Sequence, residues 1–379
     1  MKRLAYIDAL RGIAIFSVLV VHTSQKVENL PNWLANLSAQ GIYGVQIFFL
    51  ISGFSIFLSF ERRMNSEKKP LVNFFIRRFF RIAPLFYCAI ILYLLLYGLG
   101  PRYWLGDASS VTLANIIANF TFTNGFNPYW INSVVPVGWA VAIEMQFYLI
   151  APYLYRKIKN VEQAIGLTLI VLIFSQILIW ILKQNPLISS QQLWNGYLYF
   201  FLPSQLPVFS LGFVLYFLMR NAGILSQSSK NETYNSENFV FRRAFLLLGI
   251  AIYLSLSIMS NYEIIPGHIA YSIVFLLLTL SLGFYSFPFL VNRFWIEFGK
   301  ISYSIYLLHF AILFKLSEWF ANFLSATEIT LQPIPYFICL LTILLILTLP
   351  LCYLTYNFIE KNGIIWGNKL ISNLEKKSE

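Results

Sequence analysis

Arg11 and His22 lie in one apolar segment, LAYIDALRGIAIFSVLVVHT, with ten residues between them. An ionisable residue inside an apolar segment of this length is costly in a bilayer and usually serves function. Eleven helical steps of about 100° make three turns plus about 20°, so the two side chains share a face, about 16 Å apart along the axis. Asp8 precedes Arg11 by three residues and lies on the same side. A cation, an imidazole and a carboxylate on one face predict that this face of the helix lines a cavity and does not contact lipid.

The composition indicates that this helix belongs to a membrane protein. Hydrophobic residues make up 58% of the 379 residues and charged residues only 11%, whereas a soluble domain carries about 25% charged residues. The apolar runs are about 20 residues long, which suits helices that cross a hydrocarbon core of about 30 Å. The alternating pattern of an outer-membrane barrel is not evident. We therefore predict an all-α, polytopic transmembrane helix bundle embedded in a lipid bilayer.

Ten membrane-spanning helices are expected, and the sixth is expected to be kinked or broken by the prolines of LPSQLP. The predicted spans are 4–24, 41–60, 82–99, 138–155, 162–182, 194–219, 243–260, 267–287, 301–323 and 333–357. The three cysteines fall in apolar stretches and form no CxxC pair. We therefore expect buried thiols and no metal site.

The basic residues predict the orientation of these spans. With the N-terminus in the cytoplasm, only Lys26, Arg102, Lys183 and Lys315 of the 27 lysines and arginines fall on the outer side. This asymmetry predicts that both the N- and C-termini are cytoplasmic, in a multi-pass protein of the plasma (inner) membrane. The net charge of +11 therefore reflects topology and gives no indication of nucleic-acid binding. His22 would lie near the outer end of the first helix.

Several short motifs, taken in order, resemble those of the acyltransferase-3 family, integral membrane enzymes that modify extracytoplasmic glycans. The first segment carries an arginine and a histidine separated by ten residues, as the family's opening motif does. The other matching motifs are GVQIFFLISGFSI, RFFRIAP, WAVAIEMQFYLIAP, GKISYSIYLLHF and YNFIEK. Gln46 stands where the family often has aspartate. The resemblance extends from residue 4 to about residue 361, nearly the whole chain.

The resemblance implies a single integral membrane acyltransferase domain over residues 1–379, without the soluble domain that is fused to some members. It implies an O-acyltransferase that uses cytoplasmic acyl-CoA, acetyl-CoA in the first place, as donor substrate, with no metal. The implied acceptor is a hydroxyl of an extracytoplasmic carbohydrate such as exopolysaccharide or O-antigen. The sequence sets no oligomeric state.

His22 and Glu144 are the candidate catalytic residues for this reaction. Transfer of an acyl group from a thioester to a hydroxyl needs a base, and imidazole has a suitable pKa. Glu144 could fix the tautomer of the imidazole and stabilise the imidazolium, as the third member of a triad does, or it could be the base itself. A structural hydrogen bond to a neighbouring helix is the alternative for either residue.

Three arginines are candidates for binding the acyl donor. Arg78 and Arg81 are three residues apart at a predicted cytoplasmic helix start, where guanidinium groups could bind the phosphates of coenzyme A. Alternatively, they only orient the helix and contact lipid head groups. Arg11 could contact a phosphate or the pantetheine arm of the donor, or it could simply pair with Asp8.

Further residues could line the cavity or contact a substrate. In the ninth span, one face carries Ser302, Tyr306 and His309, which are spaced i, i+4 and i+7. These side chains could line the cavity, or they could only make polar contacts between helices. The complete set of such candidates is Asp8, Ser52, Trp139, Ser302, Tyr306 and His309.

A polytopic transporter or flippase for a glycan or its precursor is the alternative function. Buried charges and a proline-broken helix also suit a substrate path through a membrane. However, a transporter does not require the Arg-x10-His and Arg-x-x-Arg elements, and no inverted repeat is evident. The motifs favour the enzyme.

Overall fold

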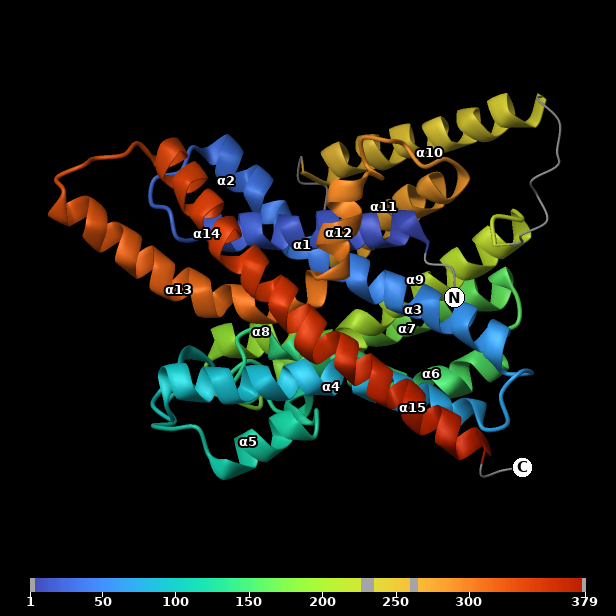
Figure 1. Cartoon of the computed structure of the whole chain (residues 1–379), viewed down its shortest axis with the longest axis horizontal. Helices are drawn as coiled ribbons and strands as arrows, with labels where there is room; N and C mark the ends of the chain where they lie inside the picture. The colour runs from blue at the N-terminus through green and yellow to red at the C-terminus, as the bar shows by residue number, and fades with distance from the viewer. Residues whose placement is uncertain (1–3, 226–234, 260–264, 377–379) are drawn as a thin grey trace. The chain divides into compact units, whose positions relative to one another are not determined.

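The chain folds into α-helices joined by loops and short 3-10 turns, which confirms the predicted fold class (Figure 1). The computed structural model describes residues 4–225, 235–259 and 265–376, and every regular element in these ranges is helical. In chain order the helices are α1 (Ala5–Ser24), α2 (Asn32–Ala39), α3 (Gly44–Arg63), α4 (Pro70–Tyr97), α5 (Leu113–Phe120), α6 (Gly138–Lys157), α7 (Val161–Gln184), α8 (Gln191–Phe200), α9 (Leu202–Asn221), α10 (Asn235–Met259), α11 (Gly267–Phe284), α12 (Arg293–Lys300), α13 (Ser302–Ala326), α14 (Pro333–Thr355) and α15 (Lys361–Lys376).

Nine helical segments within the described ranges are long and apolar enough to cross a bilayer. They overlap nine of the ten predicted spans. The remaining predicted span, 138–155, forms as the 20-residue helix α6, but it carries the polar residues Glu144 and Gln146 and is not among the nine. The chain is therefore a multi-pass membrane protein.

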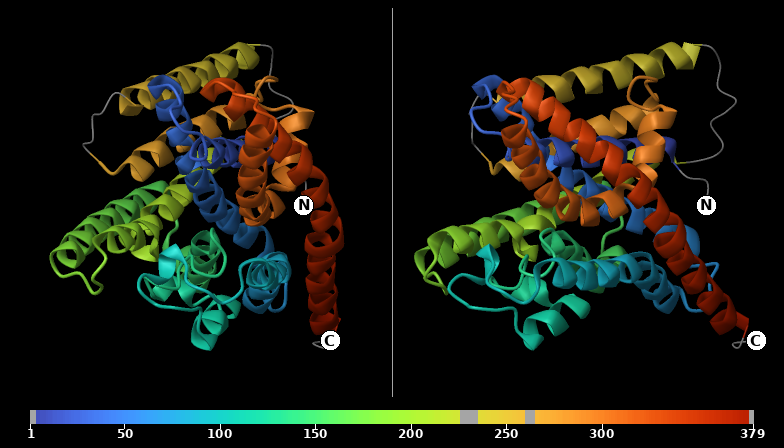
Figure 2. Two further views of the ribbon diagram at one scale, coloured as in Figure 1. Left: turned by 90° about the vertical axis from the view of Figure 1, so that its left-hand side faces the viewer. Right: turned by 60° about the vertical axis from the view of Figure 1, so that its left-hand side comes forward.

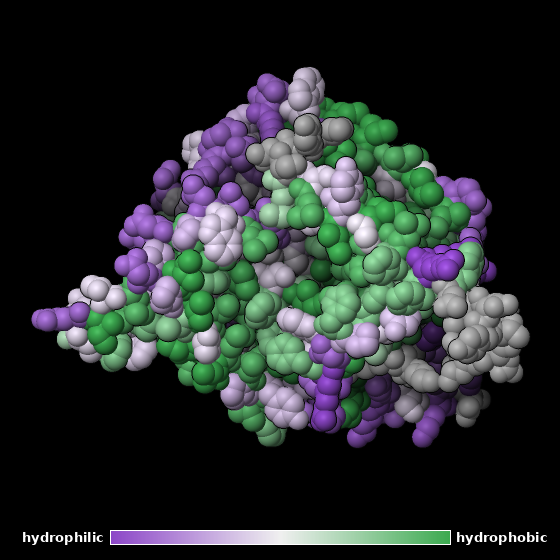
Figure 3. Space-filling model, turned by 90° about the horizontal axis from the view of Figure 1, so that it is seen from above, coloured by the Kyte–Doolittle hydropathy of each residue, from purple (hydrophilic) through white to green (hydrophobic). Residues whose placement is uncertain are grey.

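The surface of the helices supports this conclusion. Along α7, apolar side chains point outward, and Ile170 and Trp180 are 67% and 65% exposed. Figure 3 shows one face of the molecule, on which apolar side chains cover broad areas. Soluble proteins rarely expose apolar patches of this extent, whereas lipid tails would cover them in a bilayer.

The predicted break in the sixth span is confirmed. α8 ends at Phe200 and α9 begins at Leu202, because Phe201 adopts an extended conformation with φ −67° and ψ 156°. Pro203 follows in the first turn of α9, where a missing N–H costs nothing. Pro207 lies inside the helix.

Three helices differ from the predicted boundaries. α4 begins at Pro70 rather than at residue 82, so the RRFFRIAP element lies inside a 28-residue helix and not at its start. α10 begins at Asn235 rather than at residue 243. After α14, the chain does not end its helix at 357 but continues through a π-helical turn, Tyr356–Glu360, into α15. In all three, helical hydrogen bonding continues through polar segments that a hydropathy boundary excludes.

The chain forms two compact units. The first comprises Met1–Gly12, Val45–Ser66 and Phe147–Gly299, and the second comprises Ile13–Gly44, Glu67–Gln146 and Lys300–Glu379. In the first unit α7 packs on α9, α9 on α11, and α11 on α10; in the second α13 packs on α14, and α4 on α15 (Figure 2).

A close helix crossing in the first unit depends on two glycines. A Cβ atom on Gly299 of α12 would lie 1.7 Å from the backbone oxygen of Asp8, and one on Gly12 of α1 would lie 2.2 Å from that of Trp295. Only glycine allows two backbones to approach this closely. The turn of α1 that carries Asp8 and Arg11 is therefore held directly against α12.

α15 packs against α4 in the second unit through a Gly-x-x-x-Gly sequence. A Cβ atom on Gly363 would lie 2.5 Å from the backbone oxygen of Phe80, and one on Gly367 would lie 2.8 Å from the Phe80 Cβ atom. At the other end of this contact, the Glu375 carboxylate accepts hydrogen bonds from the backbone N–H groups of Lys68 and Lys69. A carboxylate at a helix N-terminus is stabilised by the free N–H groups and the helix dipole.

Candidate functional site

His22 lies in the last turn of α1, half-buried within the second unit. Its Nδ1 atom is 3.1 Å from Oε1 of Gln25. Because an amide oxygen only accepts hydrogen bonds, Nδ1 carries the proton, and Nε2 is left as the basic nitrogen of the ring. This contact therefore favours the tautomer in which Nε2 is free to accept a proton.

α13 brings a second imidazole and an aromatic ring to His22. The ring of His309 stacks on that of His22 with centroids 5.4 Å apart, and the ring of Phe310 lies 4.5 Å from it. His309 is fully buried, and its Nδ1 donates to the backbone oxygens of Tyr306 at 2.8 Å and Ile305 at 3.1 Å. The ninth predicted span thus places His309 beside His22, with Ser302 and Tyr306 also buried on this helix.

Tyr93 of α4 fixes the turn of α13 that carries His309 and Phe310. Its buried hydroxyl donates to the backbone oxygen of Leu307 at 2.9 Å and accepts from the N–H of Ala311 at 3.1 Å. These two backbone groups are an i, i+4 pair, so the hydroxyl inserts into the hydrogen-bond ladder of the helix. The positions of both rings against His22 therefore depend on this single hydroxyl.

We expect Tyr93→Phe to destabilise the protein by about 1–3 kcal/mol, because two buried backbone groups lose their partner. The turn of α13 would also be free to close its own hydrogen bond and shift His309. Thermal unfolding of the purified protein in detergent measures the effect. Tyr97→Phe, one turn further along α4, is the control, since the Tyr97 hydroxyl has no hydrogen-bond partner among the described residues. Equal stability of the two variants would contradict this role of Tyr93.

α6 supplies two more of the predicted residues of the second unit. Glu144 is half-buried and Trp139 is buried. The backbone N–H of Trp139 donates to Oδ1 of Asn132 at 3.1 Å, which ties the start of the helix to the preceding loop. The proposed partnership of Glu144 with His22 stays a prediction, since Gln25 occupies the Nδ1 position.

Three predicted residues belong to the first unit. Arg11 and Asp8 form an ion pair on α1, with Nη1 3.7 Å from Oδ1. Ser52 is buried on α3, where its hydroxyl lies 3.3 Å from that of Tyr148. The donor contact of Arg11 stays a prediction, while its alternative, the pairing with Asp8, is present.

The arginines of α4 differ in their surroundings. Arg77 forms a two-pronged ion pair with Glu67, with N–O distances of 2.9 and 3.0 Å, and this fits a structural role. The guanidinium of Arg78 lies 5.6 Å from the ring centre of Phe74. Arg81 is exposed. Arg81 therefore presents an accessible guanidinium, as phosphate binding requires.

Glu360 belongs to the YNFIEK motif. It lies buried in the π-helical turn between α14 and α15. It accepts a hydrogen bond from Ser304, which in turn accepts one from Thr355 at 3.0 Å. Arg81 interacts with it electrostatically. π-Helical turns are frequent at functional sites, but the YNFIEK sequence contains no signal that predicts one.

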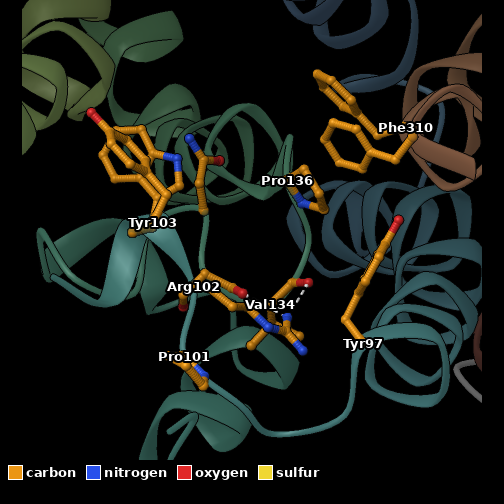
Figure 4. Close-up of a pocket in the computed structure, with 11 residues that line it drawn as sticks. Tyr97, Pro101, Arg102, Tyr103, Val134, Pro136 and Phe310 are labelled. Carbon is orange, nitrogen blue, oxygen red and sulfur yellow. Dashed lines mark hydrogen bonds between the residues drawn. The ribbon is translucent and has the colours of Figure 1, made fainter. Parts of the chain in front are cut away.

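The loop between α4 and α6 forms a cavity of about 460 Å³ next to His22 (Figure 4). Phe310, whose ring contacts that of His22, is part of its wall. Arg102 braces the loop by donating to the backbone oxygens of Gly98 at 2.5 Å and Ser133 at 2.7 Å. Burial lowers the pKa of Arg102 from its ordinary value, although an arginine remains charged in a protein. The structure therefore provides space for a ligand against Phe310, a residue that contacts His22.

Comparison with known proteins gives one family match. The sequence model of the acyltransferase-3 family, described as an acyltransferase domain, matches residues 4–356. A protein of Staphylococcus aureus (strain COL) named "Putative O-acetyltransferase" is 26% identical over 392 residues, which cover 96% of this chain and 59% of that protein. The O-acetyltransferase OatA of Staphylococcus aureus (strain NCTC 8325 / PS 47) is 23% identical over 389 residues, which cover 98% and 59%. This chain thus spans about six-tenths of the length of these relatives. No solved structure matches it.

Proposed function

Because the chain belongs to the acyltransferase-3 family, we propose that it is a membrane O-acetyltransferase whose base is His22. The observation that carries this proposal is that Gln25 bonds to Nδ1 of His22 and leaves Nε2 free. In addition, Phe310 contacts the ring of His22 and forms part of the wall of a cavity. The names of both relatives described above support O-acetyl transfer. The proposed acceptor is a hydroxyl of an extracytoplasmic carbohydrate, and the proposed location is the plasma membrane.

In the proposed reaction, the acceptor oxygen attacks the carbonyl carbon of the donor thioester while Nε2 of His22 takes the hydroxyl proton. The tetrahedral intermediate then expels the thiolate of coenzyme A, which receives that proton from the imidazolium. The products are an O-acetyl ester and free coenzyme A. General-base catalysis of this kind contributes typically 10²- to 10⁴-fold to a rate. Transient acetylation of His22 itself would need the same free Nε2 atom.

The donor is proposed to be acetyl-CoA, bound by its phosphates to the arginine face of α4. Arg81 is exposed, and Arg78 lies one helical turn from it with its guanidinium near Phe74. Guanidinium groups bind phosphate with paired hydrogen bonds. Glu144, on α6 of the same unit, is proposed to stabilise the imidazolium electrostatically. No step of this reaction requires a metal.

Release of coenzyme A tests the proposed function. We expect purified protein, supplied with acetyl-CoA and with surface polysaccharide from a strain that lacks the gene, to release free thiol in step with ester formation on the glycan. A thiol reagent measures the first product, and mass spectrometry of glycan fragments measures the second. Glycan that carries equal ester levels in the wild-type and deletion strains, together with no thiol release in vitro, would overturn the proposal.

A further inference from the structure

The cavity next to His22 has walls of aromatic rings from three separated parts of the chain. Tyr97 ends α4, Tyr103 and Trp104 lie in the following loop, and Phe310 and Phe314 belong to α13. In Figure 4, Tyr103 stands on one side of the space and Tyr97 and Phe310 on the other. Tyr103 is 59% exposed, so its ring is accessible to a ligand. Aromatic walls suit a ligand with apolar faces.

Polar groups at the wall distinguish this cavity from an acyl-chain pocket. The hydroxyl of Tyr97 and Nε of Arg102 are buried and have no hydrogen-bond partner among the described residues. The side-chain oxygen of Asn132 is occupied by the N–H of Trp139 at 3.1 Å, so its NH₂ group is the part that a ligand can use. Buried polar groups are normally paired, and leaving them unpaired costs free energy. A ligand with hydroxyls would pair with the accessible Asn132 NH₂ group, whereas a hydrocarbon would not.

The cavity also has a neighbour in common with His22. The Phe310 ring lines the cavity and lies 4.5 Å from the ring of His22. Lys26, one turn beyond His22, has its ammonium 4.6 Å from the ring centre of Phe314 on the same wall. A ligand in this cavity would therefore contact Phe310, whose ring lies against that of His22, the proposed base.

A second cavity of about 320 Å³ continues the same loop surface. It is lined by hydrogen-bonding side chains and by two aromatic residues, Tyr129 and Trp130. Asn115 of this cavity donates to the hydroxyl of Ser133 of the first at 2.7 Å, so one hydrogen bond joins the two walls. Both cavities combine aromatic rings with hydrogen-bonding groups. Two such cavities side by side suit a chain of linked units better than a single small molecule.

We propose that the first cavity binds the sugar ring that receives the acetyl group and that the second binds the neighbouring sugar of the same glycan chain. A pyranose ring has apolar C–H faces, which pack on aromatic rings, and hydroxyls around its edge, which pair with groups such as the Asn132 amide. This inference rests on the proposed function. It makes Tyr103 and Asn132 acceptor-binding residues.

Asn132→Asp tests the inference at a single group. Aspartate keeps the oxygen that accepts the Trp139 N–H at the start of α6 but loses the NH₂ donor, so we expect the thermal stability and the acetyl-CoA affinity to be retained. The KM for deletion-strain polysaccharide rises about three- to tenfold, the value of one hydrogen bond. A loss of stability with an unchanged KM would show a structural role instead and overturn the assignment.

Tyr103→Ala tests the stacking wall, with Phe126→Ala as its control. Phe126 is an exposed ring in the same loop region (67% exposed) that lines neither cavity. We expect Tyr103→Ala to reduce glycan acetylation tenfold or more at equal protein levels, and Phe126→Ala to have no effect.

The outcomes separate the inference from the function on which it rests. If wild-type protein acetylates the glycan and both Asn132→Asp and Tyr103→Ala do so equally well, the function stands and the acceptor cavity is wrong. If the variants instead change the preference between acetyl-CoA and butyryl-CoA, the cavity holds the acyl group and the inference is overturned. If wild-type protein transfers nothing, the proposed function itself fails.

Discussion

His22→Ala lowers the rate of glycan acetylation about 10²- to 10⁴-fold, because general-base catalysis typically contributes a factor of this size. Its Nε2 is the basic nitrogen of a ring whose other nitrogen bonds to Gln25. Alanine removes the base but leaves the stack of His309 on Phe310, with centroids 4.4 Å apart, within α13. The measurement is the initial rate of coenzyme A release by purified protein at saturating acetyl-CoA and glycan.

His268→Gln is the matched control among the three histidines of the chain. His268 is buried in the first unit, with Nε2 3.1 Å from the backbone oxygen of Ser204, where it packs against Tyr199. We expect this variant to keep its rate per folded molecule. If His22→Ala protein that is folded and binds acetyl-CoA normally still transfers at the wild-type rate, His22 is not the base.

Gly299→Ala prevents the protein from accumulating in the membrane in folded form. The added Cβ atom would lie 1.7 Å from the backbone oxygen of Asp8, a distance that no side-chain rotation relieves. Overpacking costs typically 1–3 kcal/mol, and more when backbone must move. Because Gly12 meets α12 at the same crossing, the whole contact of α1 with α12 must open. Detergent-resistant folding, followed by fluorescence-detected gel filtration, reports the loss.

Gly166→Ala and Gly249→Ala provide controls of the same chemical change. Both glycines lie inside helices, and a Cβ atom on either would meet nothing within 4 Å. Alanine is a better helix former than glycine by about 1 kcal/mol. These variants therefore accumulate at least as well as the wild type. Normal folding of Gly299→Ala would show that α1 and α12 are not in direct backbone contact.

Local sequence patterns predicted part of the site. Membrane-length apolar runs predicted the helices, and an eleven-residue step along one helix singled out His22. Spacing on the ninth span put His309 on a polar face with Ser302 and Tyr306, and the structure shows that this face brings an imidazole to His22. These features depend on periodicity within one segment, and sequence alone reveals periodicity.

The features that were missed depend on contacts between segments. The role of Tyr93 follows from where its hydroxyl meets α13, and the cavity combines Tyr97 with Phe310, more than 200 positions away in the chain. The turn at Glu360 differs from an α-helix by one residue of hydrogen-bond register, for which its sequence gives no signal. Gly363 and Gly367 do form a recognisable spacing, but their segment was placed beyond the last predicted span, in a tail.

The carboxylate of Glu375 sits where the polypeptide enters α4, the helix that presents Arg78 and Arg81. Although α15 lies near the far end of the chain, it therefore stabilises the start of α4, the helix that carries Arg78 and Arg81. Any shortened version prepared for crystallisation or microscopy must keep the chain through Glu375. A reporter protein attached inside α15 would disturb the start of α4 and, with it, the proposed donor site.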